Sequence, residues 1–199
     1  WLNQPIVKLR VAYIDFVGAF LDPDYKSPDQ YYSSNRFVPF GGEERVQRLR
    51  LMLERFLAGG VLLRVLSVDY SNDQIASKLE SVGLLDVCGC IAGHDDQSFV
   101  NAGLRRSRFI GMEMSHWGWA FGEALLIDHS PTHVSEAHRY CKTFLLRDPL
   151  ELLTEKEMKE IESKYLRIEH EIETCPQYVD YARTQVMSTS RTAPSYAGA

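Results

Sequence analysis

Short apolar runs alternate along the chain with segments whose apolar residues recur at helical spacing. Runs with the length and composition of buried strands occur at 11–14, 61–68, 87–91, 124–127 and 143–146. Apolar residues three or four positions apart predict helices over 43–57, 71–82, 131–140 and 154–168. This alternation predicts an α/β fold, a three-layer, Rossmann-like arrangement in which helices cover both faces of a parallel sheet of about five strands.

Three of the predicted helices begin at recognisable capping residues. Ser71 and Thr154 each precede a Gln or Glu by three positions, and Ser130 is followed directly by a proline. The segment 93–122 has no comparable pattern. Its Trp117 and Trp119 alternate as strand or loop residues do, and they predict either a lid on the core or an exposed docking patch.

The composition indicates a globular intracellular protein. The 199 residues carry a net charge of −5 with a pI near 5.7, so no global positive charge draws the chain to nucleic acid or to an anionic membrane. No apolar run reaches membrane-spanning length. Four irregularly spaced cysteines predict free thiols in a reducing compartment. The sequence does not identify the organelle, because a leader could have preceded Trp1.

Two regions interrupt the α/β pattern. Residues 22–42 are polar and rich in Pro and Gly, which indicates a long irregular segment too short for a separate cap domain. After the proline at 176, aromatic residues are scattered without periodicity. We therefore expect an α/β domain over 1–174 and a C-terminal extension over 175–199 that binds a protein partner.

Polar residues stand where three of the predicted strands end. Asp15 and Asp128 each close an apolar run, and Ser67 lies near the end of another. Open parallel sheets bind ligands at the carboxyl ends of their strands, and two carboxylates with a hydroxyl suit a divalent cation and a phosphate. Aspartate after a strand is equally a common loop residue, so these positions alone leave both interpretations open.

The order of these pieces resembles the haloacid dehalogenase superfamily of aspartate-nucleophile phosphatases. The resemblance runs from about residue 11 to 149, with Asp15-Phe16-Val17-Gly18-Ala19 in the place of a DxDGT motif. Ser67 in LRVLSVDY matches the hydroxyl residue of the second motif, and Asp128 in LLIDHSPTHV matches the acidic fourth motif. The resemblance implies neighbouring first, second and fourth strands and no large cap domain.

The resemblance also implies roles for individual residues. Asp15 would be the nucleophile and Ser67 a phosphate ligand, while the Asp15 carboxylate, the Val17 main-chain carbonyl and Asp128 would form a Mg²⁺ cradle. The family's lysine before the fourth motif has no counterpart between Lys78 and Lys142. One residue of the arginine group would replace it at the phosphate, and that group consists of Arg105, Arg106 and Arg108.

The departures from the motifs concern catalytic groups. Val17 replaces the aspartate that protonates the leaving group, Ala19 replaces a threonine, and His129 replaces the second acid of the fourth motif. His129 and His133 also have the four-residue spacing of a zinc pair, without an intervening glutamate. Because valine cannot transfer a proton, we expect a catalytically inactive, phosphatase-like domain that needs no cofactor.

That domain would serve as a structural or interaction subunit of a larger assembly, through its tail and its open sheet edge. Two alternatives stay open. One is a Mg²⁺-dependent phosphatase with altered acid chemistry, and the other is a regulator that binds a phosphate ligand without turnover.

Overall fold

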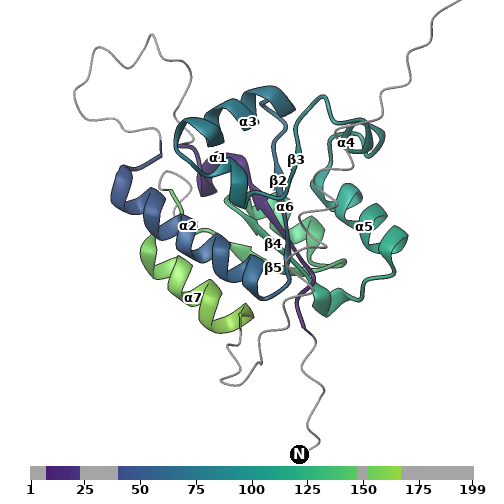
Figure 1. The fold of residues 1–199 in the computed structure, drawn as a ribbon. Coiled ribbons are helices and arrows are strands. Elements are labelled where there is room, and N and C mark those ends of the chain that lie inside the picture. The colour runs from purple at the N-terminus through teal and green to yellow at the C-terminus, as the bar shows by residue number, and fades with distance from the viewer. Residues whose placement is uncertain (1–7, 23–39, 148–151, 167–199) are drawn as a thin grey trace, which may run out of the picture. The chain divides into compact units, whose positions relative to one another are not determined.

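A five-stranded, all-parallel sheet forms the centre of the protein in the computed structural model, which describes residues 8–22, 40–147 and 152–166. The strands lie in the order β3-β2-β1-β4-β5 (Figure 1). Their bounds are β1 (Val11–Asp15), β2 (Leu62–Leu66), β3 (Cys90–Ala92), β4 (Ala124–Asp128) and β5 (Lys142–Leu145). The predicted α/β architecture with a five-stranded parallel sheet is confirmed.

The central strand explains why the sheet needs helices on both of its faces. All five residues of β1 are buried, and the first four alternate between two separate hydrophobic cores. Ala12 and Ile14 belong to one core, whereas Val11 and Tyr13 belong to the other. A strand that is apolar on both sides can be stable only between two layers of helices.

Six helices supply those layers. The core around Ala12 and Ile14 is completed by α2 (Glu43–Ala58), α3 (Asn72–Ser81) and α7 (Glu155–Tyr165). The opposite core takes its helical residues from α4 (Gln97–Asn101), α5 (Arg106–Trp117) and α6 (Pro131–Ala137). Short turns complete the described elements, namely α1 (Phe16–Ala19), η2 (Leu85–Val87) and η3 (Phe121–Glu123).

The predicted capping residues begin their helices as expected. The Ser71 hydroxyl accepts from the Gln74 amide at 3.3 Å, and the Gln74 side chain accepts from the Ser71 amide at 2.9 Å. Thr154 and Glu157 form the same reciprocal pair at the start of α7. Ser130 caps α6 through the amide of His133 at 3.4 Å.

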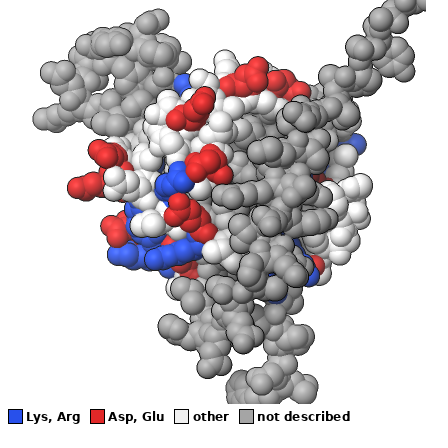
Figure 2. All heavy atoms as spheres, viewed as in Figure 1, with Lys and Arg blue, Asp and Glu red and all other residues white. Residues whose placement is uncertain are grey.

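Helices α2 and α7 lie side by side and are joined by ion pairs on their outer surface (Figures 1 and 2). Arg48 contacts both carboxylate oxygens of Glu162, at 3.0 and 2.6 Å, and Arg55 reaches the same carboxylate at 2.8 Å. Figure 2 shows acidic and basic side chains next to one another on the described part of this surface.

Three predicted elements differ from the structure. The third strand begins at Cys90 rather than 87, because 85–87 forms a 3₁₀ turn. Helix α6 ends at Ala137 rather than near 140. The segment 93–122 contains two helices, and Trp117 is in the last turn of α5 rather than in a strand or loop. The apolar spacing of α5 is hard to recognise in the sequence, because the buried residues of its first turn are the polar Arg106 and Ser107.

The tail over 175–199 and most of the irregular segment 22–42 lie outside the described residues. The domain boundary at 174 lies there too. Among the described helices, none combines the length and the apolar character that crossing a membrane would require.

Candidate functional site at the carboxyl edge of the sheet

The strand register places the predicted acidic residues at one edge of the sheet. Asp15 pairs with Leu66 of β2, and Ile14 pairs with Ile127 of β4, so Asp15 and Asp128 end neighbouring strands at the same level. Ser67 follows Leu66 at this edge. Both carboxylates and Ser67 are fully buried. The predicted meeting of Asp15 and Asp128 at this edge is confirmed, and Ser67 comes directly after the adjoining strand β2.

Arg106, from the first turn of α5, lies between the two carboxylates. Its Nη2 donates to Asp15 Oδ1 at 2.5 Å, and its Nε lies 3.1 Å from Asp128 Oδ2. The second contact has the distance of an ion pair without the alignment of a hydrogen bond, so Arg106 Nε and Asp128 Oδ2 lack hydrogen-bond partners among the described residues. Arg106 is itself only 3% exposed.

Two histidines complete the Asp15 cluster, which we define as Asp15, Arg106, Asp128, His129 and His133. Nδ1 of His129 lies 2.7 Å from Asp15 Oδ2 and 3.8 Å from Asp128 Oδ1. Nδ1 of His133 lies 3.3 Å from Asp128 Oδ2. Both oxygens of Asp15 are therefore engaged, one by a guanidinium and the other by an imidazole.

The charges within this cluster compensate one another. The hydrogen bond to Asp15 raises the pKa of His129 above its ordinary value, although burial opposes this. Burial raises the pKa of Asp15, while the hydrogen bond from His129 and the charge of Arg106 act against it. Short contacts to two cationic donors are those of an ionised carboxylate. With His129 protonated, two carboxylates then face one guanidinium and one imidazolium.

The loop that follows Asp15 is held by hydrogen bonds to its backbone carbonyls. Arg45 of α2 donates to the carbonyls of Ala19, Phe40 and Leu153, at 2.6, 3.0 and 3.1 Å. Burial lowers the pKa of this arginine to about 10. The Leu153 amide donates to the carbonyl of Gly18 at 3.0 Å. These contacts fix the turn that sets the direction of the chain after the strand.

A side chain at position 18 would strain this turn and crowd His129. Its φ of +87° is a conformation that other residues rarely adopt, and a Cβ would lie 2.9 Å from His129 Nδ1. We expect Gly18→Ala to lower the free energy of unfolding by about 2–3 kcal/mol, because left-handed strain is added to a displaced imidazole. Urea denaturation measures this loss.

Gly118 provides the control for this substitution. Its φ of +67° and ψ of +28° are left-handed, but nothing lies within 4 Å of its Cβ position. Gly118→Ala should therefore show the left-handed backbone strain alone, about 1 kcal/mol. Equal losses in the two variants would contradict the proposed contact between residue 18 and His129.

The raised pKa of His129 predicts a pH dependence of stability. A cation stabilised in the folded state contributes fully below the ordinary histidine pKa of about 6.5, and this contribution disappears as the pH rises through the raised value. Urea denaturation of the wild type and His129→Gln should therefore differ most near pH 6 and least near pH 9. A constant difference would show that the imidazole does not titrate against Asp15.

The structure separates the three arginines predicted to bind phosphate. Arg106 is buried against both carboxylates, whereas Arg105 and Arg108 are exposed and line a neighbouring pocket. Sequence reasoning left open which of the three contacts the aspartate. The sequence feature that singles out Arg106 is its spacing of three and four positions from the apolar Phe109 and Ile110, because residues at this spacing share one face of a helix.

Within the described residues, the Ser67 hydroxyl and the Val17 side chain have contacts other than the Asp15 carboxylate. The Ser67 hydroxyl accepts from the Asp69 amide at 3.2 Å. Val17 is extended, with ψ of 133°, and its side chain packs on the hydrophobic core that includes Ile14. Sequence reasoning identified His129 as a departure from a motif but missed its contact with Asp15.

Three groups of the cluster could ligate a metal ion by proximity. Asp15, Asp128 and His129 each offer a donor atom, and these atoms lie within 4.8 Å of one another. Two of these donors are carboxylate oxygens, which Mg²⁺ takes as ligands, whereas an imidazole nitrogen is not a typical Mg²⁺ ligand. One of the three donors is an imidazole nitrogen, and the Arg106 guanidinium contacts both carboxylates.

Neither a family model nor a curated protein matches the chain. A solved structure of an uncharacterized protein from Listeria monocytogenes serotype 4b is similar, with 12% identity and a TM-score of 0.49. The match covers 92% of this chain and 99% of that one.

Proposed function

We propose that this chain is a haloacid dehalogenase-like domain without phosphatase activity that serves as a structural or interaction subunit of a larger assembly. The observation that carries the proposal is the state of Asp15, which is fully buried and has both carboxylate oxygens engaged, by Arg106 and by His129. A nucleophilic carboxylate needs a free oxygen in line with the phosphorus atom.

The sheet topology supports the family assignment within this proposal. The central β1 ends at Asp15, its neighbour β4 ends at Asp128, and its other neighbour β2 leads into Ser67. That arrangement is the one that the motif order implies. The contact of Arg106 with Asp15 also agrees with an arginine in the place of the family's lysine.

The residue two positions after Asp15 supports the proposed absence of catalysis. General acid catalysis requires an ionisable group within hydrogen-bond reach of the leaving group. Val17 has none, and its side chain packs on the core instead. Loss of such a group commonly costs about a hundredfold or more in rate.

The compensated charges of the Asp15 cluster support a function that does not need Mg²⁺. A cation between Asp15 and Asp128 would have to displace the guanidinium of Arg106, which already compensates their charge. The proposed function therefore does not require Mg²⁺.

Exposed aromatic side chains support the interaction role. Trp117 and Phe121 are 51% and 46% exposed, and Trp117 stacks on Trp119 with ring centroids 5.9 Å apart. Clustered surface aromatics are enriched at protein interfaces. The tail over 175–199, which we propose as a second contact, lies outside the described residues.

Phosphatase assays on the purified chain test the proposal. Incubation with p-nitrophenyl phosphate and Mg²⁺ should give no hydrolysis above the buffer rate, because Asp15 presents no free oxygen. Val17→Asp should not create activity, and Val17→Asn is its uncharged control. Turnover by the wild type that Asp15→Asn abolishes would overturn the proposal in favour of an active phosphatase.

A further inference from the structure

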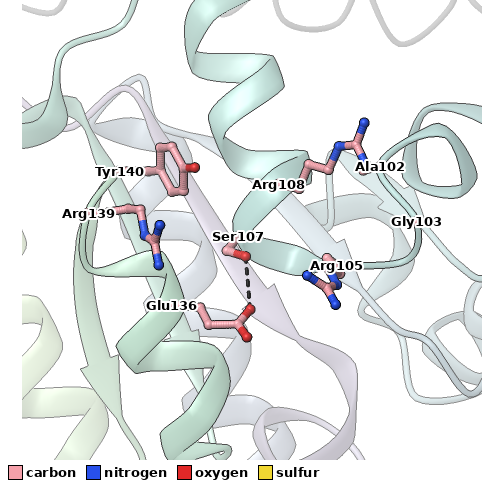
Figure 3. Close-up of a pocket in the computed structure, with 8 residues that line it drawn as sticks. All are labelled: Ala102, Gly103, Arg105, Ser107, Arg108, Glu136, Arg139 and Tyr140. Carbon is pink, nitrogen blue, oxygen red and sulfur yellow. Dashed lines mark hydrogen bonds between the residues drawn. The ribbon is translucent and has the colours of Figure 1, made fainter.

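A pocket with a different character lies next to the Asp15 cluster. It is a cavity of about 340 Å³ between the start of α5 and the end of α6 (Figure 3). Its polar lining consists of Arg105, Ser107, Arg108, Glu136, Arg139 and Tyr140. We propose that this basic pocket binds a small organic phosphate, with the phosphate held by the arginines and the organic group against Tyr140.

The charge of the basic pocket is the first argument. Three arginines and one glutamate line the pocket, which leaves two net positive charges in a chain whose total is −5. Within the described residues, Arg105 and Arg108 form no ion pair. A phosphate monoester carries nearly two negative charges at neutral pH, and arginine binds its oxygens in a bidentate manner.

The single carboxylate of the pocket is already engaged. Glu136 accepts a hydrogen bond from the Ser107 hydroxyl at 3.0 Å (Figure 3). Figure 3 shows Arg105 and Arg139 on the two sides of this bond, one from the residue preceding α5 and the other from beyond the end of α6. One of the two Glu136 oxygens is therefore occupied by the Ser107 hydroxyl.

A glycine lets the aromatic wall of the basic pocket approach α5 closely. Gly111 lies in the interior of α5, where a Cβ would approach the Tyr140 ring to 2.9 Å. Glycine weakens a helix interior, so its presence here fits the close approach of the ring. Arg139 lies 5.9 Å from the centroid of the same ring, which brings a cation to the aromatic wall.

The size of the cavity favours a small molecule over a bare ion. A volume of about 340 Å³ is within the range of ligand pockets and exceeds what phosphate alone fills. Tyr140 is 37% exposed and so has ring surface available for contact. These features specify the chemical class of the ligand as an organic phosphate monoester.

Calorimetric titration with phenyl phosphate and with inorganic phosphate tests this inference on the full chain. Phenyl phosphate should bind more tightly than inorganic phosphate, and Tyr140→Ala should remove the difference. Arg105→Gln and Arg139→Gln should each weaken phenyl phosphate binding about tenfold. Arg147→Gln is the matched control, because Arg147 is an exposed arginine paired with Glu160 outside the pocket.

Two further variants separate this inference from the proposed function. Glu136→Gln removes the negative charge of the pocket and should tighten phenyl phosphate binding. Ser67→Ala, at the hydroxyl that the family resemblance assigns to phosphate, should leave this binding unchanged, since Ser67 does not line the pocket. Arginine variants that bind phenyl phosphate like the wild type would overturn the inference, as would loss of binding in Ser67→Ala alone.

Discussion

Replacing Arg106 with methionine should lower the free energy of unfolding by about 3–5 kcal/mol, the usual cost of removing one partner from a buried ion pair. Arg106 is the guanidinium that contacts both Asp15 and Asp128, and all three side chains are almost inaccessible to solvent. Without it, two buried carboxylates would face only the imidazoles of His129 and His133. Urea denaturation at neutral pH measures the loss.

Arg105→Met is the matched control for this substitution. The two arginines are adjacent in the chain, but Arg105 is exposed and has no ion pair in the part of the chain that the structure describes. Its replacement should change stability by no more than about 0.5 kcal/mol. Similar losses in both variants would show that the contacts of Arg106 with the carboxylates do not stabilise the fold.

The same pair of proteins tests whether Arg106 takes the place of a cation. Mg²⁺ should leave the melting temperature of the wild type unchanged, because the guanidinium already neutralises the carboxylates. In Arg106→Met, added Mg²⁺ should raise the melting temperature, since a ligand that binds only the folded state stabilises it. A wild type stabilised by Mg²⁺ as strongly as the variant would contradict this account.

Asp15→Asn should lower the free energy of unfolding by about 3 kcal/mol, the second large effect that we expect. The neutral amide cannot accept charge-assisted hydrogen bonds from both Arg106 and His129, at 2.5 and 2.7 Å in the wild type. Replacing a strained catalytic group is commonly neutral or even stabilising. The sign of this change therefore distinguishes a structural aspartate from a nucleophile under strain.

Asp86→Asn is the control for the loss of an aspartate ion pair at the surface. Asp86 pairs with Arg50 at 2.6 Å, but its side chain is 64% exposed, so the cost should be about 0–1 kcal/mol. NMR titration of His129 supplies an independent measurement. Because the hydrogen bond to Asp15 is the largest cause of its raised pKa, Asp15→Asn should lower that pKa. An unchanged titration would contradict the contact.

The sequence by itself determined the layers and the edge at which the acids meet. Apolar runs such as that of β1 can be buried on both faces only inside a three-layer fold, and strand ends in a parallel sheet share one edge. Local capping rules likewise placed the starts of α3 and α7. These features depend on short-range pattern, which a single chain displays directly.

Only the tertiary structure decided which polar groups touch. Arg106 is separated from Asp15 by 91 positions and is chosen over Arg105 and Arg108 by the rotation of α5 against the sheet. Gly18 similarly leaves room for His129, which is 111 positions away, because glycine has no Cβ to collide with the imidazole. Such contacts depend on packing and not on local spacing, since burial decides which charges must compensate one another.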